Sequence, residues 1–188
     1  MKNAFTQSIQ QAISVLRADG IIAYPSDSIP GLGCLPHSKK ALQKIINLKQ
    51  RSSNKAFILL GTKRKHFDTW VETKWLDWIE EQKVSTNTTW VVPCKDIPHK
   101  LLTGHYDTIA IRFVKHPVVE ALCETCGAIT STSINIESEK SLTHLSQLSL
   151  PFAQQIDYII DCGDRFKEFE SGKGSTIVDA NSGNILRK

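Results

Sequence analysis

The residues Tyr24–Cys34 read YPSDSIPGLGC and directly follow a short apolar run that ends at Ala23. With two prolines, two glycines, two serines and an aspartate, this stretch is too irregular for a regular helix. The apolar run before it predicts a strand, and the periodic segment after it predicts a helix. A loop between a strand and a helix is where α/β proteins often place a ligand. The stretch therefore predicts an α/β fold with a binding loop near its start.

Helical and strand patterns alternate on both sides of this loop. Apolar residues recur at helical spacing before Gly20 and again after Ser38, which is the predicted N-cap of a second helix. A third helix is predicted from Pro117 to about Gly127. Short strands are predicted at 21–24, 56–60, 89–93, 108–113, 128–133 and 157–162, and a final hairpin turns at 181–184. This pattern predicts one α/β domain over residues 1–188 with a mixed sheet and flanking helices.

Two further segments have weaker patterns. Residues 67–82 contain three of the four tryptophans and predict one or two short helices. Residues 136–149 form the most polar stretch of the chain and predict a surface loop with a short helix.

Composition is that of an ordinary globular chain, with 188 residues, 40% of them hydrophobic and 22% charged. No apolar run approaches the roughly 20 residues that a membrane-spanning helix needs. The N-terminal segment lacks the apolar core of a secretory signal, and five cysteines fit a reducing compartment. We therefore expect a cytoplasmic protein without membrane contact. A net charge of +4 is compatible with an anionic ligand or with transient RNA contact.

Metal and redox chemistry are not predicted. Cys123 and Cys126 form a C-x-x-C near the end of a predicted helix, whereas a reactive pair sits at a helix start, where the dipole lowers the thiol pKa. We interpret them as ordinary, partly buried cysteines. The six histidines are scattered, with neither an H-x-x-x-H spacing nor a second C-x-x-C, so we expect no metal site.

Three cations, Lys49, Arg51 and Lys55, gather where a predicted helix ends and a strand begins. Capping of the helix dipole and a solvated surface are one explanation. The functional explanation is a polyphosphate clamp, because arginine supplies a bidentate fork and lysine a compact charge. No Walker A loop is present, and Gly31 and Gly33 lack the third glycine of the dinucleotide fingerprint, so they are also explained by a tight turn.

Three more segments offer groups for an anion. The sequence STSIN at 131–135 ends a predicted strand, and its hydroxyls and amide suit either an anion or a plain turn. Arg112 lies inside an apolar strand, where a buried charge needs a partner such as a bound anion; an edge strand whose arginine reaches solvent is the alternative. The third is GSTIVD at 174–179 together with Arg187. Such groups suit a reaction in which the protein positions the substrates and neutralises their negative charge, as in nucleotidyl transfer.

Taken in this order, the motifs resemble those of the YrdC-like family, the threonylcarbamoyl-AMP synthases. The resemblance covers essentially the whole chain and rests on YPSDSIPGLGC, LKQRSSNKAFILL, TWVVP, LTGHYDTIAIRFVKHPVVEALC, STSIN, GSTIVD and ILRK. It implies a single-domain YrdC-like fold, in which a twisted mixed sheet with flanking helices surrounds a basic cavity.

The resemblance also implies a reaction. L-Threonine and bicarbonate form N-carboxythreonine, whose carboxylate attacks the α-phosphate of ATP to give threonylcarbamoyl-AMP and pyrophosphate. Partner proteins then transfer the threonylcarbamoyl group to adenosine 37 of tRNA. ATP is a substrate and is expected to bring Mg²⁺, held mostly by phosphate oxygens and water.

Ten side chains receive roles from this resemblance. The resemblance implies that the ATP phosphates are bound by Lys49, Arg51 and Lys55, and that Lys49 and Arg51 are the catalytic pair. It implies that three residues help to bind the nucleotide, namely Thr89, Asn135 and Arg187. It implies that threonine is held by Ser26, Arg112, Ser133 and Ser175.

Several positions depart from the family pattern. Ser26 and Asp27 replace Thr-Glu, Pro30 replaces an aromatic residue, and Ser52 replaces a proline. The segment 84–87 lacks the Trp-Pro-Gly-Pro that precedes the family's threonine. Ile134 replaces an alanine and is predicted to crowd the ligand.

Two other functions remain open on the sequence. One is a binding module that holds RNA or a nucleotide in the basic cavity without turnover or with weak turnover. The other is related ATP-dependent carbamoyl chemistry on a different acceptor.

Overall fold

The computed structural model describes residues 2–82, 87–135 and 140–187. Its α-helices are α1 (Lys2–Arg17), α2 (Lys39–Leu48), α3 (Thr73–Glu81), α4 (Lys100–Thr103), α5 (Pro117–Cys126) and α6 (Leu150–Ala153). Single 3₁₀ turns are η1 (Arg64–His66), η2 (Leu145–Gln147) and η3 (Lys167–Phe169). The strands are β1 (Ile22–Tyr24), β2 (Gly31–Gly33), β3 (Ile58–Gly61), β4 (Thr88–Pro93), β5 (Thr108–Phe113), β6 (Ile129–Ser133), β7 (Tyr158–Ile159), β8 (Thr176–Asp179) and β9 (Ile185–Arg187).

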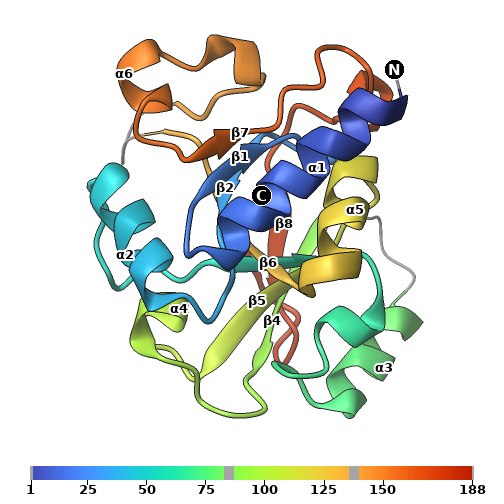
Figure 1. The fold of residues 1–188 in the computed structure, drawn as a ribbon. Helices are drawn as coiled ribbons and strands as arrows, with labels where there is room; N and C mark the ends of the chain where they lie inside the picture. Colours follow the sequence, from blue (N-terminus) through green and yellow to red (C-terminus); the bar gives the residue numbers. More distant parts are fainter. Residues whose placement is uncertain (1, 83–86, 136–139, 188) are drawn as a thin grey trace.

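The nine strands form a mixed sheet in the order β7-β1-β2-β6-β3-β5-β4-β8-β9. Three neighbouring pairs are parallel, namely β1 with β7, β3 with β5, and β4 with β8. The other neighbours run antiparallel. The predicted α/β fold with a mixed sheet is thus confirmed (Figure 1).

Helices cover the sheet and bury its apolar side chains in two clusters. Helices α1 and α5 pack against each other, and Leu16 and Leu122 lie in their cluster (Figure 1). The other cluster includes Ile45 of α2 and further side chains of α3 and α4. Strand β3 sends Leu59 into this cluster and Leu60 into the α1–α5 cluster, because successive side chains of a strand point to opposite faces.

The predicted helices are confirmed by their caps. The Ser38 hydroxyl accepts a hydrogen bond from the Ala41 N–H at 3.2 Å and so caps α2. Pro117 occupies the first turn of α5, where a missing N–H costs nothing. The final hairpin is confirmed as well, since Asp179 N–H donates to the Asn184 carbonyl at 2.9 Å.

The loop prediction for 24–34 is wrong at its end, because Gly31–Gly33 is a strand between β1 and β6. A Cβ on Gly33 would clash with the Thr130 carbonyl oxygen, and one on Gly31 would come within 2.9 Å of the Ser131 hydroxyl. These glycines therefore allow close approach of strands rather than a tight turn. The sequence signal was weak, because a three-residue strand with two glycines has no alternating pattern.

Other predicted bounds shift by a few residues. The strand expected at 157–162 is only Tyr158–Ile159, and the one expected at 56–60 is Ile58–Gly61. Residues 67–82 contain the single helix α3. Of the predicted polar loop at 136–149, residues 136–139 lie outside the described residues, and the rest includes η2. In the described part of the chain, no helix has the length and apolar character to cross a membrane.

Candidate active site

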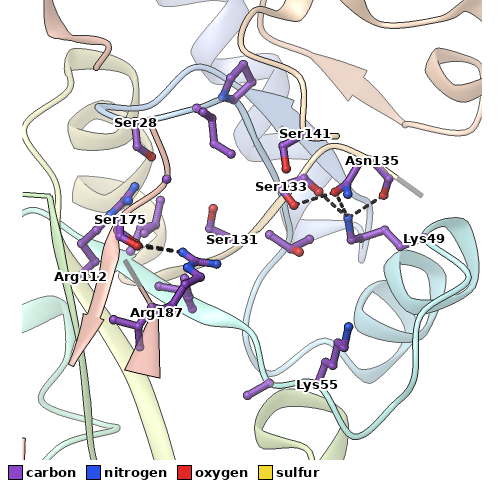
Figure 2. Close-up of a pocket in the computed structure, with 18 of the residues that line it drawn as sticks. Ser28, Lys49, Lys55, Arg112, Ser131, Ser133, Asn135, Ser141, Ser175 and Arg187 are labelled. Carbon is purple, nitrogen blue, oxygen red and sulfur yellow. Dashed lines mark hydrogen bonds between the residues drawn. The ribbon is translucent and has the colours of Figure 1, made fainter. Parts of the chain in front are cut away.

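A cavity of about 750 Å³ opens beside the ends of β5, β6 and β8 (Figure 2). Eight of the ten side chains predicted for the site line it: Lys49, Arg51, Lys55, Arg112, Ser133, Asn135, Ser175 and Arg187. Figure 2 shows Lys49, Ser133 and Asn135 on one side of the cavity and Arg112, Ser175 and Arg187 on the other. Among the described lining residues, five are cationic and none is acidic. The predicted basic cavity is therefore present.

Lys49 follows the last residue of α2 and is 4% exposed, so it does not belong to a solvated surface. Its ammonium donates to the Ser133 carbonyl at 2.6 Å, to the Asn135 carbonyl at 2.7 Å and to Asn135 Oδ1 at 2.8 Å. The Ser133 hydroxyl also donates to Asn135 Oδ1 at 2.7 Å. The lysine therefore fixes the turn that follows β6 and places a positive charge beside it.

Arg51 lies in the loop between α2 and β3, with its guanidinium 3.9 Å from the centre of the Phe57 ring. It donates to the Lys55 carbonyl at 2.9 Å and to the Thr132 hydroxyl at 3.3 Å. These contacts shape the loop around the arginine and connect it to β6. Lys55 is exposed at the mouth of the cavity.

Arg112 is 4% exposed, and its strand β5 lies between β3 and β4, so the edge-strand alternative is wrong. Its partner in the described structure is Asp27, whose Oδ1 is 2.9 Å from the guanidinium Nη2. The contact is an ion pair rather than an aligned hydrogen bond, because neither carboxylate oxygen meets hydrogen-bond geometry with a described group. The sequence predicts that a buried Arg112 needs a negatively charged partner such as a bound anion. Asp27 of the YPSDSIPGLGC loop is such a partner within the protein itself.

Burial dominates the electrostatics of this pair. It raises the pKa of Asp27, and the positive charge of Arg112 opposes this rise. It lowers the pKa of Arg112, and Asp27 opposes that change. The nearby Arg187 lowers the pKa of Arg112 further, because two like charges repel. An anion bound in the cavity would relieve this repulsion.

Arg187 of β9 contacts Ser175, the residue directly before the neighbouring strand β8. Its guanidinium Nη2 donates to the Ser175 carbonyl at 3.1 Å and to the Ser175 hydroxyl at 3.4 Å. Burial lowers the pKa of Arg187. The side chains of Arg112, Ser175 and Arg187 thus form one polar wall of the cavity (Figure 2).

Ser26 and Thr89 are the two predicted site residues that do not line the cavity. The Ser26 hydroxyl donates to the Ile29 carbonyl at 2.8 Å and so shapes the loop behind the wall. Thr89 is buried and shares a hydrogen bond of 2.8 Å with the Ser175 hydroxyl. In this structure both act on the site through neighbouring residues.

The connection from β7 to β8 closes another side of the cavity. Ser171 N–H donates to the Asp27 carbonyl at 3.0 Å, and Gly172 N–H donates to the Ser28 carbonyl at 2.9 Å. Gly172 and Ser28 both line the cavity. This connection therefore holds the YPSDSIPGLGC loop against the site.

Several lining residues were not predicted, among them Ser28, Tyr106, Ser141 and Thr143. Ser131 and Thr132 also line the cavity, and they belong to the STSIN motif, whose hydroxyls were predicted to suit an anion. Ser141 and Thr143 lie in the polar stretch that we interpreted as a surface loop. Their sequence carries no signal, because polar residues are ordinary in any surface loop.

Of the residues that depart from the family pattern, some line the cavity and others lie away from it. Pro30 lines the cavity, as expected for a change in its wall. Ile134 is 1% exposed and packs in the cluster with α2, so the prediction that it crowds the ligand is wrong. Of the segment 84–87, only Asn87 is among the described residues.

The cysteines and histidines offer no metal site in the described residues, where no three potential metal-ligating side chains gather. Burial raises the pKa of the Cys123 thiol to about 12 and also raises the pKa of Cys126. These two thiols are therefore protonated at neutral pH, which agrees with ordinary, unreactive cysteines.

Comparisons with known proteins agree with this architecture. The family model Sua5/YciO/YrdC, described as "telomere recombination", matches residues 14–188. A threonylcarbamoyl-AMP synthase of Pasteurella multocida is 43% identical over 134 residues, which cover 69% of this chain and 73% of that protein. One of Coxiella burnetii is 35% identical over 194 residues and covers 97% of this chain and 98% of that protein.

Solved structures share the fold. P. abyssi Sua5 complexed with L-threonine has a TM-score of 0.82 at 22% identity, over 95% of this chain and 53% of that one. This chain therefore corresponds to about half the length of that protein. E. coli YciO has a TM-score of 0.79 at 25% identity, over 96% of this chain and 88% of that one. With the family model matching nearly all of its length, this chain belongs to the Sua5/YciO/YrdC family.

Proposed function

We propose that this protein is an enzyme that makes L-threonylcarbamoyl-AMP from L-threonine, bicarbonate and ATP, with release of pyrophosphate and water. The observation that carries the proposal is the cavity, which has five cations, several hydroxyls and no acidic side chain among its described lining residues. Such a lining suits substrates that are all anionic or contain a carboxylate. The curated relatives named threonylcarbamoyl-AMP synthase support the same reaction.

The proposed chemistry transfers the adenylyl group. A carboxylate oxygen of N-carboxythreonine attacks the α-phosphorus of ATP and forms a new P–O bond. The bond from this phosphorus to the bridging oxygen of the β-phosphate breaks, and pyrophosphate leaves with the electron pair. No proton needs to move in this step, so the protein's contribution is to position the reactants and to stabilise negative charge.

The cations of the α2–β3 loop are proposed to bind the phosphates of ATP. Arg51 supplies a planar donor fork and Lys55 an exposed positive charge at the cavity mouth. Lys49 is already bonded to the turn after β6, so its contact with a phosphate would replace its bond to Asn135 Oδ1. The turn and the nucleotide would then be held by the same ammonium.

The opposite wall is proposed to bind threonine. Arg112 and Arg187 repel each other, so an anion bound beside them would be stabilised by both. We assign the threonine carboxylate to Arg112 and keep Arg187 as a residue that helps on the nucleotide. Ser175 on this wall and Ser133 on the other side of the cavity offer hydroxyls for the amino and hydroxyl groups of threonine. Ser26 and Thr89 would position this wall from behind.

The cavity volume supports two substrates. Ligand cavities typically have volumes of about 300–1,000 Å³, and 750 Å³ lies in the upper part of this range. Magnesium is proposed to bind with ATP through phosphate oxygens and water, since the described lining offers no carboxylate. Transfer of the product to tRNA by partner proteins remains part of the proposal.

A binding module without turnover is less well supported. An RNA binder needs cations on an exposed face, because they must reach the phosphate backbone. Here Lys49 and Arg112 are each only 4% exposed and point into a cavity. Such cations suit a small anionic substrate better than a polymer.

Pyrophosphate release by the purified protein tests the proposal. With ATP and magnesium, we expect release that requires both L-threonine and bicarbonate. Arg51→Ala should reduce the rate by about 100-fold or more, which is typical for loss of one charge-stabilising donor. Arg17→Ala removes an exposed arginine at the end of α1 and should leave the rate unchanged.

Two outcomes would contradict this function. Release that does not depend on threonine would indicate a different acceptor for the adenylyl group. Saturable RNA binding that falls steeply with salt, without pyrophosphate release, would favour the binding module instead.

A further inference from the structure

Tyr106 differs in chemistry from every other described residue that lines the cavity. The rest of this lining consists of cations, hydroxyls, amides, glycines, a proline and aliphatic side chains. Tyr106 is its one aromatic residue, and 60% of its surface is exposed. Within the described residues its ring takes part in no stacking or cation–ring contact. An exposed aromatic side chain without a ring partner thus lies at the cavity.

The backbone holds Tyr106 next to the loop that contains Arg51 and Lys55. Tyr106 lies in the turn between α4 and β5, two residues after Gly104, whose φ is +66°. A Cβ on Gly104 would clash with the backbone carbonyl of Asn54, so this turn packs directly on the α2–β3 loop. This close contact requires glycine both for its conformation and for its lack of a side chain.

A second backbone contact connects the same two segments. The Phe57 N–H donates to the Leu102 carbonyl of α4 at 2.9 Å. Phe57 in turn lies under the Arg51 guanidinium. The positions of the Tyr106 turn and of the proposed phosphate cations are therefore coupled through packed backbone.

We propose that Tyr106 binds the adenine of ATP by stacking its ring on the base. This inference rests on the proposed function, which places the triphosphate on the neighbouring loop. Of the proposed substrates, only ATP contains a flat aromatic group that matches such a ring; threonine and bicarbonate have none. Stacking on aromatic side chains is a general way to hold a nucleobase.

The test compares ATP with inorganic triphosphate, which has the phosphates but no base. Binding is measured by calorimetry without threonine or bicarbonate, so that no turnover occurs. We expect Tyr106→Ala to weaken ATP binding by about 5- to 150-fold, the range that corresponds to loss of one stacked base. Its affinity for triphosphate should equal that of the wild type. Tyr106→Phe keeps the ring and should bind ATP like the wild type.

Ile97→Ala is the matched control, because Ile97 is a 75% exposed apolar residue that does not line the cavity. It should bind both ligands normally. Unchanged ATP binding by Tyr106→Ala would overturn the stacking inference, and so would an equal loss of affinity for ATP and triphosphate. If the wild type bound neither ligand, the proposed function itself would fail, and this inference with it.

Discussion

His116 is a buried titratable residue outside the cavity, at the start of α5. It is 2% exposed, and its Nδ1 accepts a hydrogen bond from the Val118 N–H at 3.2 Å. Its ring packs edge-on against Phe166 and Phe169, with centroid distances of 5.7 and 6.0 Å. Burial lowers its pKa from 6.5 to about 4. Protonation would place a hydrogen on the nitrogen that caps the helix, so the folded protein favours the neutral ring.

This pKa predicts a pH-dependent stability. Below about pH 6.5 the unfolded chain binds a proton at His116, whereas the folded protein binds it only near pH 4. The contribution of the neutral ring is therefore complete above pH 6.5 and is lost as the pH falls towards 4, by at most about 3 kcal/mol. His116→Asn keeps a capping side chain without this titration. Denaturant unfolding at several pH values should show a smaller loss in the variant, and parallel curves would refute the prediction.

At the same scale, the sequence located charged residues of the site better than it located their partners. Lys49 and Arg51 were identified because three cations cluster between a predicted helix and a predicted strand, and Arg112 because it lies inside an apolar strand. The ion pair of Arg112 with Asp27 joins residues far apart in the sequence, and only the packed sheet brings them together. Ile134 was predicted to face the ligand but packs in the hydrophobic cluster. A shift of one residue at the end of a strand turns a side chain to the opposite face, and the sequence alone does not define this register.

Among the elements, β2 is the one that determines how the binding loop meets the rest of the sheet. It pairs with β1 on one side and with β6 on the other. The Tyr24 hydroxyl crosses this region and donates to the Thr130 carbonyl at 2.9 Å. The short strand therefore joins the two parts of the sheet through contacts that leave no room for a side chain on Gly33.

Gly33→Ala should consequently destabilise the protein. Its methyl group would meet the Thr130 carbonyl oxygen, and the cost of such overpacking is typically about 1–3 kcal/mol. Gly174→Ala is a control, since its Cβ would come no closer than 3.8 Å to Arg187 Nη2. The midpoint of urea unfolding should fall for Gly33→Ala and stay nearly constant for Gly174→Ala. Equal midpoints for the two variants would contradict the close strand contact.

The long elements were predictable and the short ones were not. Helices α1, α2 and α5 have periodic apolar faces and clear end signals. Such local patterns predict a helix from the sequence alone. Strand β2 has none of these signals, and β7 is only two residues long. Their existence depends on neighbours in the sheet, so no local pattern in the sequence reports it.

For the molecule as a whole, the cavity combines residues that are spread along most of the chain. Ser28 precedes α2, Lys49 and Arg51 follow it, Arg112 lies on β5 and Arg187 on β9. The order of the motifs predicted this family fold, but not which strands are neighbours. A ligand that contacts these elements together binds only the folded protein and should raise its stability.

We expect ATP at about 100 times its dissociation constant to stabilise the protein by about 2.7 kcal/mol. For a chain of this length, the thermal midpoint should rise by roughly 5–10 °C in differential scanning fluorimetry. Arg51→Ala should lose most of this shift, whereas Arg17→Ala should keep it. A full shift in Arg51→Ala would mean that ATP binds outside the cavity.

The sheet order described above also determines how the chain reaches its native state. Strand β1 pairs with β7 through Ile22 and Tyr158, which are 158 − 22 = 136 residues apart, and β4 pairs with β8 through Thr88 and Thr176. Closing such long loops costs entropy before any pairing energy is gained, so folding of this topology is slow compared with that of a helical bundle. Without these two pairings, β1 and β4 would each have an open edge available to another chain. A chain in which β8 and β9 have not joined the sheet lacks the cavity wall with Ser175 and Arg187, so a ligand has no complete site to bind.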